Sequence, residues 1–350
     1  MKTAKISALS GAQACSLALR QLRPAAVVSY RFRTQDNPVE FLARQAAIPH
    51  AEPLIRFASG PTSALSFSIG AARTGGRVIL ILDSGGLSPV SGLLGEASRL
   101  RLPLIINVIS NTTSSATDLL IGGDCLQFHC TSVQEVYDAN LVLSRLVEDG
   151  SVRLPVIIFQ DESKISRFVE NAAILPDSTT DKFITTIKYE HISPAPPLSA
   201  VPNQVEQKIL EKFNSYSSLF AGISGRTLRM VEAEGPTESK TALVAVGPYA
   251  EIFGGVREYF KTRSTPLKTL LLKLYHPLPE NQIKEFLVGI SNVIIIEPLI
   301  TSFGHSNLYN IIAGLLSGSG YNPNFVSLNL SRGNQEINTE LLVKLLTNIE

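Results

Sequence analysis

Residues that could carry chemistry occur at a few positions of this 350-residue chain. The stretch Asp83-Ser84-Gly85-Gly86 follows an apolar run, as phosphate-binding turns do. No Gly-x-Gly-x-x-Gly pattern and no Lys-Ser/Thr signature accompanies it, so we interpret it as a tight turn between a strand and a helix. A Gly-x-Ser-x-Gly elbow is also absent from the sequence, which disfavours serine hydrolase chemistry.

Sulfur and imidazole ligands are few. Cys125, His129 and Cys130 lie close together in the sequence, and Cys15 is the third cysteine. A metal pair is one interpretation, but a structural zinc or iron–sulfur site needs about four ligands, and no Cys-x-x-Cys spacing exists. We therefore expect the three cysteines to pack in the protein as reduced thiols and His129 to pack beside two of them. We expect no iron–sulfur cluster in this chain.

Short apolar runs that alternate with helical patterns must position these residues. The runs are rich in β-branched residues and are separated by stretches of helical spacing, which is typical of parallel strands covered on both faces. We therefore predict an α/β fold. The expected strands cover residues 25–30, 77–82, 104–109, 156–159, 241–246, 267–274, 292–297 and, as the last strand, 324–328.

A proline-rich stretch interrupts this alternation. Pro194, Pro196, Pro197 and Pro202 indicate a linker or a strap on the surface. We therefore predict two α/β domains, over residues 1–175 and 237–350, with a linker over residues 176–236.

Composition excludes several classes of protein. The net charge of +1 includes no basic excess that would indicate a nucleic-acid partner or a membrane-surface patch. The apolar runs are too short to span a bilayer, and the first residues lack the continuous apolar run of a signal peptide. We expect a soluble, cytoplasmic protein.

Three groups of motifs together resemble one known family. The first group is Ile69–Gly75, Asp83–Leu87 and Gly95-Glu96-Ala97; the second is Asp118-Leu119-Leu120, Thr131–Asp138 and Leu154–Phe159; the third is Leu272–Pro279 and Val293–Glu297. In this order they resemble the pyrimidine-binding domain and the second domain of alpha subunits of pyruvate (2-oxoacid):ferredoxin oxidoreductases.

The resemblance implies a thiamine-pyrimidine-like doubly wound parallel sheet, followed by a smaller α/β domain of the transketolase C-terminal type. It also implies a thiamine diphosphate site shared with a partner chain, because the pyrophosphate-binding and iron–sulfur parts of the family lie on other domains or chains. The partners it implies are other oxidoreductase subunits, in a homo- or hetero-oligomer.

The sequence departs from the family at three functional positions. The glutamate that activates the aminopyrimidine ring aligns with Pro61, next to Thr62, and proline has no carboxylate. In the loop after the first strand, Tyr30 and Thr34 match the family but its two prolines are missing. The arginine that holds the substrate carboxylate falls near Asn111, which lacks that charge.

We therefore keep two hypotheses for the function. The chain is a component of a 2-oxoacid:ferredoxin (flavodoxin) oxidoreductase-like complex, with a thiamine half-site that has lost its glutamate. Alternatively, it is a non-catalytic scaffold or dimerisation region of a redox assembly, because its second domain also resembles the N-terminal regions of fungal sulfite reductase subunits. A misaligned site, or a variant site that uses Arg31 or Arg33, is the remaining explanation for the missing residues.

Overall fold

The computed structural model describes residues 4–32, 37–45, 53–110, 125–184, 202–297, 307–317, 321–329 and 338–347. These residues form two compact units, the first ending at Leu228 and the second beginning at Arg229. The domain limits that we predicted, 1–175, 176–236 and 237–350, remain a proposal. None of the described helices is long and apolar enough to cross a membrane.

The first unit is built around a parallel sheet. Its strands lie in the order β6-β7-β5-β4-β2-β3, and each is parallel to its neighbour. They are β2 (Ala26–Tyr30), β3 (Leu54–Ala58), β4 (Val78–Asp83), β5 (Ile105–Ser110), β6 (Leu126–His129) and β7 (Val156–Asp161). Every residue of β2 and β7 is buried, which is why these strands read as apolar runs without alternation.

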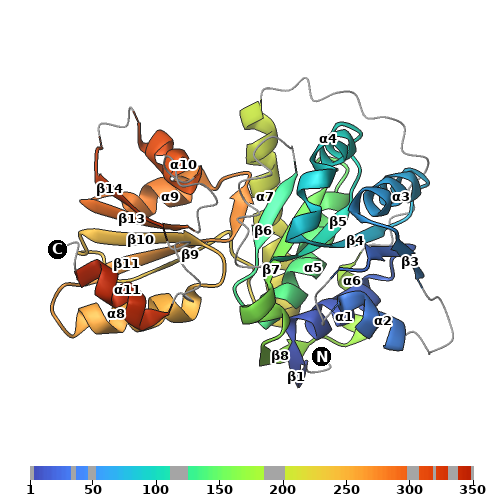
Figure 1. Ribbon diagram of the computed structural model, residues 1–350, viewed down its shortest axis with the longest axis horizontal. Helices are drawn as coiled ribbons and strands as arrows, with labels where there is room; N and C mark the ends of the chain where they lie inside the picture. The colour runs from blue at the N-terminus through green and yellow to red at the C-terminus, as the bar shows by residue number, and fades with distance from the viewer. Residues whose placement is uncertain are drawn as a thin grey trace. The chain divides into compact units, whose positions relative to one another are not determined.

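Helices cover both faces of this sheet (Figure 1). One face carries α3 (Pro61–Arg73) and α4 (Ser91–Arg99), and the other carries α1 (Gly11–Leu22), α2 (Pro38–Gln45) and α5 (Val133–Glu148). Two further helices, α6 (Asp177–Phe183) and α7 (Pro202–Ser224), both lie within the range that we predicted to be a linker. A small antiparallel sheet pairs β1 (Lys5–Ser10) with β8 (Val169–Ile174). Short helical turns follow β4 (Ser84–Gly86 and Ser88–Val90) and β7 (Glu162–Ser166).

The second unit is a smaller, mostly parallel sheet. The strands lie in the order β14-β13-β10-β11-β9, and only β9 is antiparallel to its neighbour. They are β9 (Val231–Glu234), β10 (Thr241–Val246), β11 (Leu267–Leu272), β13 (Asn292–Glu297) and β14 (Asn324–Asn329), and the short β12 (Leu274–His276) follows β11.

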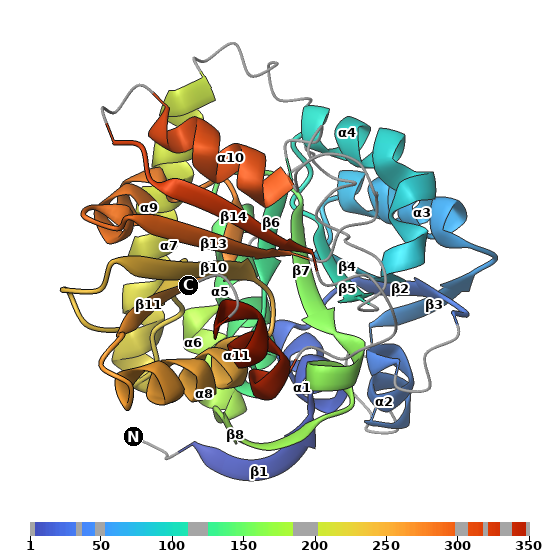
Figure 2. The same ribbon diagram turned by 60° about the vertical axis from the view of Figure 1, so that its left-hand side comes forward.

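Helices also cover both faces of the second sheet (Figure 2). One face packs against α9 (Glu280–Leu287) and α10 (Asn307–Leu316), and the other packs against α8 (Ala250–Lys261) and α11 (Thr339–Thr347). The two cores are separate sets of buried residues, because alternate side chains of β10 and β13 point to opposite faces. The prediction of a doubly wound parallel sheet followed by a smaller, mostly parallel sheet is confirmed.

Candidate functional site

The carboxyl ends of the parallel strands in the first unit carry polar residues. β2 ends at Tyr30, β4 at Asp83, β5 at Ser110, β7 at Asp161 and β6 at His129. Because all these strands are parallel, their last residues meet at one edge of the sheet, where ligands of open α/β sheets bind. This edge is therefore the candidate functional site of the first unit.

At this edge, residues from four elements (β2, α3, β4 and the turn Ser84–Gly86) form a tight cluster. The hydroxyl of Tyr30 donates a short hydrogen bond to Oδ1 of Asp83, and the same oxygen accepts the backbone N–H of Gly86 at 2.9 Å. A methyl group added at Gly86 would overlap with the Tyr30 hydroxyl and lie 3.2 Å from Cβ of Pro61. Two predicted site residues, Tyr30 and Pro61, therefore lie together, and Asp83 and Gly86 complete the cluster.

The raised pKa of Tyr30 determines which group donates the hydrogen bond between Tyr30 and Asp83. Burial raises the pKa of Tyr30 well above its usual value, and the neighbouring Asp83 carboxylate raises it further. The tyrosine therefore stays protonated and neutral, and Asp83 is the acceptor. The sequence had indicated Asp83 only as part of a turn, because the contact with Tyr30 joins positions far apart in the chain.

The first turn of α3 explains why a proline is tolerated at position 61. Pro61 is the first residue of the helix, a position whose backbone N–H has no partner within a helix. Gly60 precedes it, and Ser63 takes over the cap, since its hydroxyl accepts the Gly60 N–H at 3.1 Å and donates to the Gly60 carbonyl at 3.0 Å. Thr62 is exposed on this turn. The predicted residues Thr34 and Asn111 lie outside the described residues.

His129 and the cysteines are packed in the protein interior. The ring of His129 stacks on Phe159 with centroids 4.4 Å apart, and burial lowers its pKa to about 3. Burial raises the pKa of the Cys15 thiol to about 12, and Cys125 and Cys130 are also buried. Within the part of the chain that the structure describes, no three His, Cys, Asp or Glu residues are grouped as metal ligands would be.

The start of α5 contains the Thr131–Asp138 stretch on which part of the family resemblance rests. Ser132 caps the helix by accepting the backbone N–H of Glu135 at 3.2 Å. Gln134 binds both backbone groups of Ala173 on β8, with its amide oxygen at 2.7 Å from the backbone nitrogen and its amide nitrogen at 3.3 Å from the carbonyl oxygen. This part of the motif therefore attaches β8 to α5.

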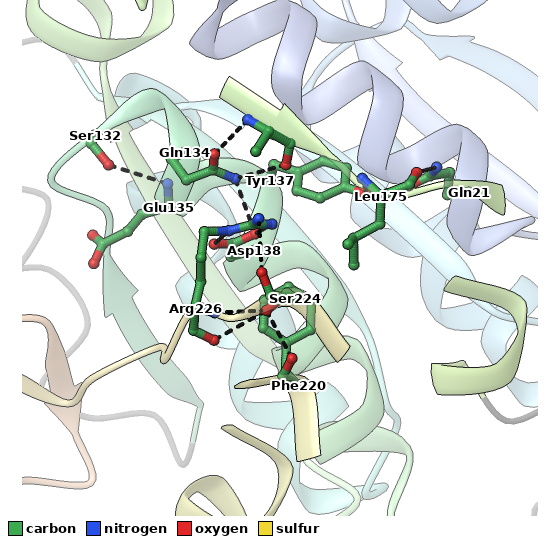
Figure 3. A network of polar contacts seen from close by, with 11 residues as sticks. Gln21, Ser132, Gln134, Glu135, Tyr137, Asp138, Leu175, Phe220, Ser224 and Arg226 are labelled. Carbon is green, nitrogen blue, oxygen red and sulfur yellow. Dashed lines mark hydrogen bonds and ion pairs between the residues drawn. The ribbon is translucent and has the colours of Figure 1, made fainter. Parts of the chain in front are cut away.

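The next turn of α5 binds two further segments (Figure 3). The Tyr137 hydroxyl donates to Gln21 of α1 at 2.5 Å and accepts the Leu175 N–H at 3.1 Å. Asp138 accepts two hydrogen bonds from the guanidinium of Arg226, at 2.9 and 2.8 Å. In this chain, the second half of the motif therefore connects α5 to α1, to the end of β8 and to the segment after α7.

The folds of the two units together are typical of one class of two-domain protein. A fully parallel sheet with helices on both faces, followed by a smaller, mostly parallel sheet, is the two-domain arrangement that the motifs implied. Two solved structures share this fold along 98% of the chain. A 2-oxoglutarate:ferredoxin oxidoreductase from Magnetococcus marinus aligns with a TM-score of 0.70 at 15% identity, over 65% of its own chain. A split-gene transketolase, an inactive beta4 tetramer, aligns with a TM-score of 0.59 at 11% identity, over 98% of its chain.

Sequence comparison then specifies the family. Residues 58–218 match the family model described as pyruvate flavodoxin/ferredoxin oxidoreductase, thiamine diphosphate-binding. Pyruvate synthase subunit PorA of Thermotoga maritima is 24% identical over 96% of this chain and 92% of its own length. Ketoisovalerate oxidoreductase subunit VorA of Pyrococcus horikoshii is 26% identical over 50% of this chain and 46% of its own length. These matches confirm the resemblance to alpha subunits of the 2-oxoacid:ferredoxin oxidoreductase family.

Proposed function

We propose that this chain is a subunit of a 2-oxoacid:ferredoxin oxidoreductase-like complex and that its half of the thiamine site has lost the activating carboxylate. Two relatives that cover most of the chain are named as subunits, pyruvate synthase subunit PorA, which supports a role within a complex. The partners in this proposal are other oxidoreductase subunits or domains, or a second copy of the chain, and they contribute the remaining parts of the site.

The observation that carries the proposal is the environment of Pro61. The family resemblance places the activating glutamate at this position, and proline offers neither a carboxylate nor an N–H. The acid nearest to it in the described cluster is Asp83, whose Oδ1 already accepts hydrogen bonds from Tyr30 and Gly86. The described residues around Pro61 therefore do not fit the acid contact that an activated aminopyrimidine ring needs.

A second function remains a candidate because of the same observation. A chain without the activating acid can serve as a scaffold that holds the redox subunits of a complex together. A sulfite reductase is one such complex, since the second domain resembles the N-terminal regions of fungal sulfite reductase subunits. A partner that carries sirohaem or flavin, in a complex without thiamine diphosphate, would favour this scaffold.

Anoxic purification of the tagged full-length chain from its native source tests the proposal. Mass spectrometry would identify the partners, and thiamine diphosphate would be quantified in the same preparation. We expect oxidoreductase subunits as partners, with no 2-oxoacid turnover that depends on this chain. Stoichiometric thiamine diphosphate together with 2-oxoacid oxidation by the wild-type complex would refute the loss of chemistry.

A pair of substitutions at position 61 sharpens this test. Pro61→Glu returns a carboxylate to the first turn of α3, where an acidic residue also interacts favourably with the helix dipole. Pro61→Ala is the matched control without a charge. If the missing acid is the main defect, Pro61→Glu raises the thiamine diphosphate content of the complex and Pro61→Ala does not.

A further inference from the structure

Two arginines lie together at the opposite edge of the first unit's sheet, away from the candidate site. Arg101 precedes β5 and Arg153 precedes β7, and these strands are parallel neighbours that pair Ile105 with Val156. Nη2 of Arg101 donates to the backbone carbonyls of Ser151 and Val152, at 3.3 and 3.0 Å. The guanidinium of Arg101 therefore lies against the chain that leads directly into Arg153.

The backbone holds both arginines in an uncommon conformation. Arg101 has φ 52° and Arg153 has φ 39°, both in the left-handed region that non-glycine residues rarely adopt. Each follows a helix and closes its turn with a backbone hydrogen bond, from Arg101 N–H to Ser98 at 2.8 Å and from Arg153 N–H to Asp149 at 3.1 Å. Two tight turns therefore fix the positions from which the two side chains leave the backbone.

The positive charges of this pair are not balanced by acids among the described residues. Neither arginine forms an ion pair there, and the Nε atoms of both are buried without a hydrogen-bonding partner. The two carboxylates that precede Arg153 are already engaged, since Glu148 pairs with Arg77 and Asp149 pairs with Lys212. Burial lowers the pKa of Arg101, and the charge of the second arginine lowers it further.

We propose that Arg101 and Arg153 form a binding site for a phosphate-type oxyanion. A guanidinium offers a planar set of donors that matches phosphate oxygens, and two of them together match a doubly charged anion. Both residues are half-buried, so water screens their charges less than at a fully exposed position. The site is independent of the thiamine half-site, because it lies at the amino ends of the strands.

Thermal unfolding of the full-length chain tests the proposal, with inorganic phosphate as the probe and sodium chloride at the same ionic strength as the reference. We expect millimolar phosphate to raise the Tm of the wild type by about 2–4 °C. Arg153→Gln should abolish this rise. Arg99→Gln, which removes the same charge from an exposed arginine paired with Glu96, should keep it.

The same variants show whether Arg153 has only a structural role. Without phosphate, Arg153→Gln should be at least as stable as the wild type, because it loses no hydrogen bond of the described side chain and relieves repulsion from Arg101. Equal Tm values in phosphate and chloride for the wild type would overturn the proposal. It would also be overturned if Arg153→Gln kept the phosphate response, or if it were less stable than Arg99→Gln in chloride.

Discussion

The ion pair between Arg226 and Asp138 is expected to attach the segment after α7 to the first unit. The side chains are 22% and 7% exposed, and Asp138 also accepts a hydrogen bond from Gln134 at 3.1 Å. Arg226→Met keeps an unbranched apolar stem, removes the guanidinium and leaves the Asp138 carboxylate buried without its cation. Removing one partner of a buried pair costs about 3–5 kcal/mol. Since Arg226 is partly exposed, we expect the lower end, about 3 kcal/mol.

The loss of unfolding free energy in Arg226→Met is expected to depend on pH. Burial raises the pKa of Asp138, and the hydrogen bonds and charge of Arg226 oppose that rise. In Arg226→Met the opposing contribution is lost, so the folded-state pKa lies further above the unfolded value of about 3.9. The buried carboxylate then gains a proton as the pH falls through that folded pKa. The free-energy loss of the variant should therefore be largest at neutral pH and should shrink in acid.

Urea denaturation followed by far-UV circular dichroism measures this loss, since the chain has no tryptophan. The matched control is the same substitution in an Asp138→Asn background, where no charge is left behind. There we expect Arg226→Met to cost less than about 1 kcal/mol, since no carboxylate is left buried without its cation. A loss below about 1 kcal/mol in the Asp138 background, or a loss that does not change with pH, would refute the reasoning.

Three further predictions concern the sheet edge and α7. Gly86→Ala should destabilise by about 1–3 kcal/mol, because the new methyl group overlaps with the Tyr30 hydroxyl, and Tyr30→Phe in the same chain should recover most of that loss in urea denaturation. Folded His129 stays neutral down to about pH 3, whereas the unfolded chain is protonated below about pH 6.5, so wild-type stability should fall with pH. From about pH 6.5 to 5 the fall should be roughly 2 kcal/mol, and it should be absent in His129→Gln. Burial raises the pKa of Asp149, but hydrogen bonds from Ser151, Tyr216 and Lys212 hold that pKa well below its usual value. The contribution of Asp149 to the free energy of unfolding is therefore present above about pH 4 and lost in stronger acid. Asp149→Asn should remove this acid dependence in denaturation experiments, and Tyr216→Phe should cost about 1 kcal/mol of unfolding free energy.

Much of the fold could be predicted from local patterns. The buried strands β4, β5 and β7 are runs of branched apolar residues, and the start of α5 has a serine cap in front of an apolar periodic pattern. In the first unit, local patterns did not predict β1, β3, β6 and β8. β1 and β8 are exposed over much of their length, so neither has a local signal of burial. They pair with each other although most of the first unit's sequence lies between them.

The candidate site was only partly predictable. The family resemblance indicated Tyr30, Pro61 and Thr62, but it did not indicate that Asp83 would accept the Tyr30 hydroxyl. That hydrogen bond joins the ends of β2 and β4, and it depends on the order of strands in the sheet. The pairing of Arg101 with the chain before Arg153 has the same origin, because β5 and β7 are neighbours in the sheet but not in the sequence.

The amino-acid sequence by itself determined the α/β class, the identity of most of the buried strands and the absence of a carboxylate at position 61. These features depend on residue type and on short-range periodicity, which a linear pattern contains. Only the tertiary structure decided that Tyr30, Pro61, Asp83 and Gly86 form one cluster. Contacts between residues far apart in the chain depend on strand order and helix packing, which are properties of the whole core.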